Sequence, residues 1–346
     1  MLAIGEKTKH WLVLCAKSLM AIGIVWYLLS TGAVDWTKVQ SLRAHSFAVG
    51  GVIAIFLLMY AISVVRWRML LSCQNIPLTL RDASEATWFS LFLNCILPGG
   101  GIGGDTYRVA YVACRFPVNR AAGVMSVLVD RGLGFYALVS VAAFVALAYL
   151  PLVMSNPVLM SLAVCAGLVT VSGALLAIIA GVCTPDGVGS HAGGAVLSSA
   201  AGVRRIVAAV RQATGLYAKA PFTMCAALGL SLVIQALAII AVMILGVTME
   251  FSHMSPTDYV FAAPWGWLAN LFPLTLGGIG VGEVAFEKVC HLIKVGDATG
   301  GYATIFLGYR VLATGATLPG LIVWLLSAKS WKGVTQPYEM LEGVRE

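Results

Sequence analysis

Long apolar runs alternate with short polar segments along most of the chain. A transmembrane helix needs about 20 consecutive, mostly apolar residues. Segments that meet this requirement lie near 11–30, 46–66, 121–149, 157–183, 222–247 and 299–327. The first follows Lys7 and Lys9 and contains no clear cleavage site, so we interpret it as a retained signal-anchor helix. The pattern therefore predicts about six membrane spans.

Two further apolar segments, 87–114 and 258–294, are each interrupted by a motif rich in proline and glycine that ends in an acid. The motifs read NCILPGGGIGGD from Asn94 to Asp105 and NLFPLTLGGIGVGE from Asn270 to Glu283. About a dozen helix-compatible residues flank each break, which is enough for half a bilayer at about 1.5 Å per residue. Each segment is therefore predicted to be a pair of half-helices that meet at a glycine-rich tip.

The distribution of lysine and arginine indicates how these two segments sit in the membrane. If each is a re-entrant hairpin, both termini are cytoplasmic and nearly all basic residues outside the spans face the cytoplasm, with Lys38, Arg43, Lys288 and Lys294 on the other side. If the first segment crossed fully, the loop 184–221 and its four basic residues would be exported. Basic residues favour the cytoplasmic side. Hairpins are therefore the better interpretation.

This topology makes the two hairpins enter from opposite sides. The unit 46–149, consisting of a span, a hairpin and a span, then recurs upside down at 222–327. Inverted repeats with broken helices are typical of secondary transporters, because the two halves can alternate which side is open. We therefore expect an all-α polytopic membrane protein, with residues 1–346 forming one transmembrane domain and 184–221 forming a cytoplasmic linker that includes an interfacial helix or a solvated one.

Each half also contains an arginine in an apolar span. Arg131 follows Asp105 by 26 residues, and Arg310 follows Glu283 by 27. A buried arginine costs several kcal/mol unless it is paired or hydrated. In one interpretation Asp105, Asp130 and Glu283 neutralise the two arginines as structural ion pairs. In the other, the guanidinium groups and the helix N-termini at the tips bind an anionic headgroup.

Composition supports the membrane assignment and excludes other classes. Hydrophobic residues make up 60% of the 346 residues and charged ones 11%, whereas soluble domains carry roughly 25% charged residues. The net charge of +7 is spread over apolar helices, so it cannot form the continuous basic face that nucleic acid requires. The eight cysteines and five histidines show no metal-ligand spacing. Because no nucleotide-binding signature is present either, we expect no cofactor and no metal.

The candidate substrate-binding residues come from the two tips and the arginine-containing spans. They are Asn94, Pro98, Gly100, Gly103, Asp105, Arg108, Asp130, Arg131, Gly277, Gly278, Glu283 and Arg310. Three weaker candidates are Arg66, Gln235 and Tyr309. Arg66 could equally anchor the second span at the membrane interface together with Trp67.

These residues in combination resemble the lysylphosphatidylglycerol synthase transmembrane, or flippase-like, family, and the resemblance covers nearly the whole chain. It implies a multi-span protein of the bacterial inner membrane that moves lipids, typically aminoacylated phosphatidylglycerol, between leaflets. The cargo is not fixed by the resemblance, because glycolipid, polyprenyl-linked and hopanoid-type lipids also fit it. A homo-oligomer is compatible with the sequence.

Bifunctional members of that family carry an aminoacyl-transferase domain after the membrane part, whereas this sequence ends shortly after Trp331. We therefore expect a lipid transporter without enzymatic activity, whose partners are anionic, zwitterionic, polyprenyl or hopanoid-type lipids. Two alternatives stay open. One is an intramembrane enzyme that acts on lipid headgroups through its acids and arginines, and the other is a membrane scaffold for cell-envelope lipid assembly.

Overall fold

The structure is a computed structural model of the chain. It describes residues 44–96, 102–116, 120–182, 215–251, 254–271, 280–294 and 301–320, together with Gln40, Leu42 and Ile322. Every regular element within these ranges is a helix. The predicted span 11–30 and most of the linker 184–221 lie outside the described residues.

Four described helices are long and apolar enough to cross a membrane, as the sequence predicts. They are α3 (Ser46–Cys73), α6 (Arg120–Ala148), α8 (Pro157–Val182) and α10 (Pro221–Thr248). Helix α3 continues about two turns beyond the predicted end of its span. A short helix, α7 (Leu150–Ser155), separates α6 from α8. The Asn156 side chain then accepts the N–H groups of Val158 and Leu159, so it caps the start of α8.

The two interrupted segments are each a pair of shorter helices that pack against each other. The first pair consists of α4 (Leu80–Ile96) and α5 (Ile102–Arg115), and the second of α11 (Pro256–Ala269) and α12 (Val281–Ile293). The predicted helix–break–helix pattern is therefore confirmed, while the tips at 97–101 and 272–279 lie outside the described residues.

Both pairs begin with the same local signal. Thr79 accepts the N–H of Asp82 at the start of α4, and the Asp258 carboxylate accepts the N–H of Ser255 at the start of α11. A hydroxyl residue followed three positions later by an acid can satisfy N–H groups that the first helical turn leaves without partners. Pro256 adds a residue whose missing N–H is harmless at the first helical position.

The last predicted span, 299–327, is not one unbroken helix. Helix α13 (Ala303–Gly315) ends before a turn at Ala316 and Thr317, and helical backbone resumes at 318–320. Pro319 explains the break, because a proline ring clashes with the carbonyl four residues earlier and removes a backbone donor. The tighter hydrogen bonds from Thr317 to Thr314 and from Gly320 to Thr317 replace the regular pattern.

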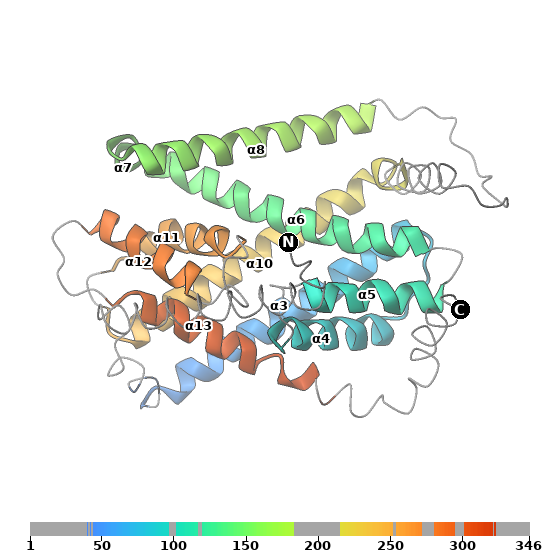
Figure 1. The fold of residues 1–346 in the computed structure, drawn as a ribbon, viewed down its shortest axis with the longest axis horizontal. Coiled ribbons are helices and arrows are strands. Elements are labelled where there is room, and N and C mark those ends of the chain that lie inside the picture. The colour runs from blue at the N-terminus through green and yellow to red at the C-terminus, as the bar shows by residue number, and fades with distance from the viewer. Residues whose placement is uncertain are drawn as a thin grey trace, which may run out of the picture.

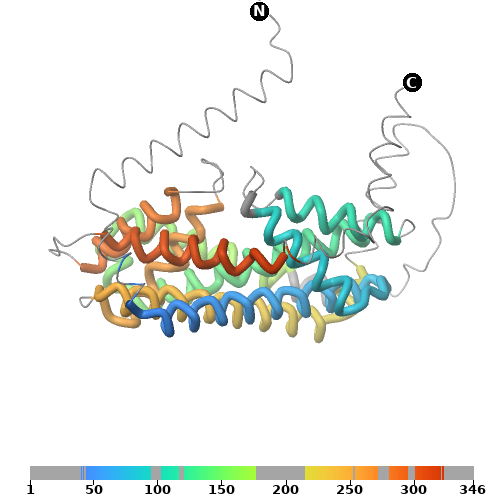
Figure 2. The backbone as a smooth tube through the Cα atoms, turned by 90° about the horizontal axis from the view of Figure 1, so that it is seen from below, coloured from blue at the N-terminus to red at the C-terminus, as the bar shows by residue number. Residues whose placement is uncertain are grey.

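The helices run mostly along the long axis of the molecule (Figure 1). Helices α3 and α10 pack along each other, α6 packs on both, and α8 packs on α6. The α4–α5 pair lies toward one end of the long axis and the α11–α12 pair toward the other. In both views the helix ends next to the two tips point toward the middle of the molecule (Figure 2). This arrangement directs the two acidic motifs toward the centre.

Large apolar side chains cover much of the outer surface, especially on α8. Val158, Leu168, Val171 and Leu176 each expose more than 60% of their surface. Such a continuous apolar exterior is unfavourable in water but suits contact with lipid. The described helices thus have the outer surface of a multi-pass membrane protein.

Candidate functional site

The same backbone contact occurs beside both tips. The Asn94 side chain accepts the N–H of Gly104 at 2.7 Å, and the Asn270 side chain accepts the N–H of Gly282 at 2.9 Å. A Cβ at Gly104 would overlap the Ser90 carbonyl and the Asn94 amide, and one at Gly282 would overlap the Asn270 amide. In each pair, an asparagine near the end of the first helix therefore holds the start of the second, and only glycine allows the approach.

The residue after each glycine is the motif acid, and each acid pairs with the arginine that the spacing singles out. Arg131 donates from Nε and from a terminal nitrogen to the two Asp105 oxygens, both at 2.6 Å. Arg310 Nε lies 2.7 Å from Glu283 Oε1. Both acids stand in the first turn of their helix, where the helix dipole favours a negative charge.

The two pairs differ in exposure. The Arg131 side chain is 48% exposed and that of Asp105 19%, whereas the values for Arg310 and Glu283 are 23% and 1%. Glu283 also accepts the N–H of Gly280 at 2.9 Å, where the backbone adopts a positive φ of 88°. The first pair is thus a two-pronged bridge open to the surroundings, and the second is a buried bridge built into a helix start.

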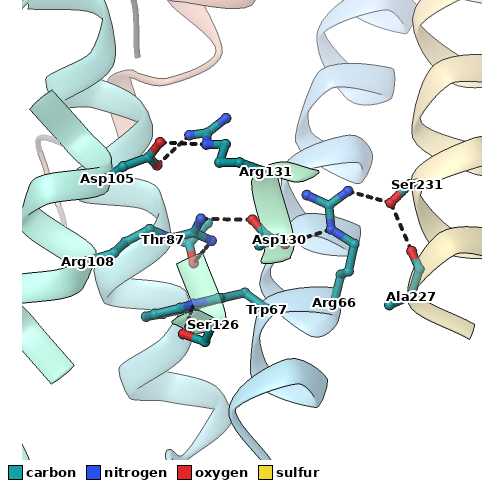
Figure 3. A network of polar contacts seen from close by, with 10 residues as sticks. All are labelled: Arg66, Trp67, Thr87, Asp105, Arg108, Ser126, Asp130, Arg131, Ala227 and Ser231. Carbon is teal, nitrogen blue, oxygen red and sulfur yellow. Dashed lines mark hydrogen bonds and ion pairs between the residues drawn. The ribbon is translucent and has the colours of Figure 1, made fainter. Parts of the chain in front are cut away.

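Behind the first pair lies a buried triad of charged residues, Arg66, Arg108 and Asp130 (Figure 3). The Asp130 carboxylate accepts a hydrogen bond from Arg66 Nε at 2.7 Å and another from Arg108 at 3.1 Å. The three side chains are between 1% and 8% exposed. Arg66 also donates to the Ser231 hydroxyl at 2.7 Å. One carboxylate therefore serves two guanidinium groups in the interior.

Neutral groups complete the surroundings of Arg108. It donates to the Thr87 hydroxyl at 3.1 Å, and its guanidinium lies 4.4 Å from the centre of the Trp67 ring, a cation–π contact (Figure 3). Trp67 in turn donates to Ser126 at 3.2 Å. The network of the triad joins α3, α4, α5, α6 and α10, so it ties the first helix pair to the long helices.

The structure places several predicted residues differently from the sequence interpretation. Asp130 was expected to neutralise Arg131 or Arg310, but its hydrogen bonds go to Arg66 and Arg108. Consecutive helical residues point about 100° apart, so Arg131 reaches the tip while Asp130 faces the interior. Arg66 is buried at 7% exposure within α3 and pairs with Asp130, so its guanidinium faces the protein interior.

The remaining candidates are in less distinctive positions. Gly103 stands in the first turn of α5, Gln235 is half-buried on α10 one turn beyond Ser231, and Tyr309 packs against the rings of Phe56 and Trp267. The structure says nothing of four others, which lie outside the described residues: Pro98, Gly100, Gly277 and Gly278. Among the described residues, no group of histidine, cysteine and acidic side chains could hold a metal ion.

Sequence reasoning missed three functional neighbours. Asn270 also accepts from Arg310 at 3.2 Å, and its match with Asn94 in the repeated motif could have revealed it. Ser231 and Thr87 are ordinary small residues in helices, and no sequence signal distinguishes them. Their roles depend on which helix lies opposite.

Comparison with known proteins adds one finding. Residues 14–320 match the family described as the lysylphosphatidylglycerol synthase TM region. No curated protein and no solved structure matches the chain. All the residues whose contacts are described above lie within this matched range.

Proposed function

The chain belongs to the lysylphosphatidylglycerol synthase TM region family, and from this premise we propose that it is a lipid transporter without enzymatic activity. In this proposal it moves the headgroup of a phospholipid or glycolipid between the leaflets of the bacterial inner membrane, through a polar cavity between two inverted halves. Both termini face the cytoplasm. The family is associated with membrane lipid chemistry, which supports a lipid as the ligand.

The arrangement of the helix pairs supports the inverted repeat. The α4–α5 and α11–α12 pairs approach the centre from opposite ends of the long axis (Figures 1 and 2). If the long helices cross the membrane roughly along this axis, the two pairs are re-entrant hairpins of opposite orientation. Units 46–149 and 222–327 then present one acidic tip each, and alternating access can expose the tips to either side.

One observation carries the proposal: the helix that follows each glycine-rich motif starts with an acid that is paired with an arginine of an apolar helix. In the first unit the pair is two-pronged, with both distances at 2.6 Å, and the Arg131 side chain is 48% exposed. A phosphate presents two oxygens to a guanidinium in the same geometry as a carboxylate. The arginine is therefore held in position by Asp105 until a lipid phosphate replaces the carboxylate.

The proposed cycle needs no covalent step. The lipid phosphate engages Arg131, Arg310 and the positive ends of the nearby helices, while the displaced carboxylates exchange a proton, or bind an amine where the headgroup carries one. The acyl chains stay in the bilayer, which avoids exposing their apolar surface to water at about 0.8 kcal/mol per CH₂. After release, each carboxylate pairs again with its arginine. Neither arginine is then left buried and unpaired.

Reconstitution into liposomes tests this proposal. Acyl-labelled fluorescent lipids should redistribute between leaflets with no change in their mass. Arg131→Ala and Arg310→Ala should each slow this redistribution at least about tenfold, whereas Arg81→Ala is the control, because Arg81 is 87% exposed in a surface pair. Monodispersity and unfolding temperature in detergent verify that each variant is folded.

Other outcomes would favour the other functions. A change in lipid mass would indicate an enzyme acting on headgroups. Folded variants that redistribute lipid as fast as the wild type would make the ion pairs structural. Absence of any redistribution by the wild-type protein would overturn the transporter and leave the scaffold.

A further inference from the structure

We propose that the site selects headgroups that carry one net negative charge, such as a phosphodiester without an amine, and that Arg108 is the residue that sets this selectivity. The inference rests on the proposed transport function. It concerns which lipids the site accepts, and it follows from the excess of positive charge around the first tip.

Around the first tip, ion pairs join five charged side chains among the residues that the structure describes. Three are guanidinium groups and two are carboxylates: Arg66, Arg108, Arg131, Asp105 and Asp130. The cluster therefore carries one net positive charge. Around the second tip, the described residues give no positive excess: Glu283 pairs with Arg310, and the buried Glu287, one turn further along α12, pairs with His291. The excess positive charge is therefore confined to the first tip, and it is this tip that favours an anion.

The excess positive charge belongs to the buried triad. Asp130 is shared by Arg66 and Arg108, whose side chains are 8% and 2% exposed. The Nε of Arg108 is buried and has no hydrogen-bond partner. The remaining contacts of Arg108, to the Thr87 hydroxyl and to the Trp67 ring, bring no negative charge. A second anion would therefore be needed to compensate the cluster fully.

The excess charge lies directly behind the exposed pair. Arg108 follows Asp105 by three residues on α5, so the two stand about one turn apart. Asp130 and Arg131 are consecutive on α6. A ligand that replaces Asp105 at Arg131 would thus sit close to the triad. Buried charges are poorly screened by salt, so the triad acts on the charge of the whole headgroup.

In the second half of the chain, the positions that correspond to Arg108 and Asp130 carry no charge. Phe286 stands three residues after Glu283, where the first half has Arg108, and Tyr309 precedes Arg310, where the first half has Asp130. Phe286 is fully buried and stacks on Phe306 at 5.0 Å between ring centres. A buried apolar residue can therefore support a tip of the same geometry. The tip contacts do not require Arg108, and this leaves its charge available for selectivity.

The first experiment uses the wild-type protein in liposomes. Acyl-labelled NBD-phosphatidylglycerol, with one net negative charge, is compared with NBD-phosphatidylethanolamine and NBD-lysylphosphatidylglycerol, which are zwitterionic and cationic. Dithionite quenching measures the label left in the outer leaflet. We expect phosphatidylglycerol to be moved at least about tenfold faster than either of the others, equivalent to about 1.4 kcal/mol in the barrier.

The second experiment changes the charge alone. Arg108→Gln leaves Asp130 paired one-to-one with Arg66, so this variant retains a balanced buried pair and is expected to fold. The rate ratio of phosphatidylglycerol to phosphatidylethanolamine should fall toward one. Arg108→Lys keeps the charge but loses the planar fork, and it should keep most of the preference.

The outcomes separate this inference from the transport function. Equal rates for the three lipids, or faster movement of a zwitterionic or cationic one by the wild type, would overturn the selectivity and leave transport standing. A folded Arg108→Gln variant with the wild-type ratio would overturn the role of Arg108. If the wild type moves none of the lipids, the transport function fails and the inference fails with it.

Discussion

The two interrupted segments share the contacts at their tips and differ in what lies behind them. In each, an asparagine holds the N–H of a glycine, and the following acid pairs with an arginine 26 or 27 residues later. Behind the first tip the interior contains the charged triad of Arg66, Arg108 and Asp130. Behind the second tip, the positions equivalent to Arg108 and Asp130 carry the aromatic side chains of Phe286 and Tyr309.

The aromatic side is as well buried as the charged one. Phe286 and Phe306 are at most 1% exposed and stack nearly parallel, with an angle of 25° between their rings. Tyr309 packs against Phe306 and against Trp267, with ring centres 6.0 and 5.6 Å apart. Such contacts stabilise a core without any desolvation of charge.

This difference shows which features a tip needs. The asparagine–glycine contact and the acid–arginine pair are present with either kind of support, so they define the tip itself. A buried ion triad is usually no more stabilising than an apolar core of the same volume. Its presence in one half points to a role other than stability, in agreement with the proposed selectivity for anionic headgroups.

The largest expected effect comes from removing the shared carboxylate of the triad. Asp130→Asn leaves Arg66 and Arg108 buried without a counter-charge, which should destabilise the fold by about 3–5 kcal/mol. Tyr309 occupies the equivalent position in the second half and offers the control. Tyr309→Phe keeps the ring contacts, so it should lower the stability of the fold by less than about 1 kcal/mol. Thermal unfolding in detergent measures both. An unchanged unfolding temperature for Asp130→Asn would show that water solvates Arg66 and Arg108, and that the triad is not buried.

A smaller effect is expected at the two tip glycines, and it should be unequal. A Cβ at Gly104 meets the Ser90 backbone, which cannot move aside easily, so Gly104→Ala should cost about 1–3 kcal/mol. A Cβ at Gly282 meets the Asn270 side chain, which can rotate away with the loss of its hydrogen bond, and the cost should be nearer about 1 kcal/mol.

Gly132→Ala is the matched control for both, because nothing lies within 4 Å of a Cβ at that position on α6. Alanine is favoured over glycine within a helix, so this variant should unfold at the same temperature or slightly higher. Equal destabilisation by all three substitutions would contradict the close approach at the tips.

The smallest expected difference lies between the tip acids. Glu283 is 1% exposed, and its carboxylate serves both Arg310 and the N–H of Gly280; Glu283→Gln should therefore lower stability by about 1–3 kcal/mol. Asp105 pairs with a half-exposed arginine, so Asp105→Asn should cost at most about 1 kcal/mol. Unfolding of the two variants under identical conditions gives the comparison. The reverse order would mean that the first pair is the more enclosed one.

Much of the architecture could be predicted from the sequence. The four described spans are confirmed because uninterrupted apolar runs of span length can bury their backbone polar groups only as helices. The breaks at the two motifs are confirmed because a proline with several glycines close by makes a helix costly there, whereas the single Pro264 is accommodated inside α11. The run 299–327 shows the limit of this rule: it is long and apolar, but among its described residues Pro319 and the turn at Ala316 and Thr317 interrupt the helix.

The sequence by itself determined the class of the protein, the two breaks and the acid–arginine spacings, because these depend on local composition and on helical periodicity. The tertiary structure alone decided that Asp130 serves Arg66 and Arg108 rather than the adjacent Arg131, and that Ser231, 165 residues away, completes the surroundings of Arg66. Periodicity tells which side chains share one face of a helix. Which other helix that face meets, and at what register, is set by the packing of the whole bundle.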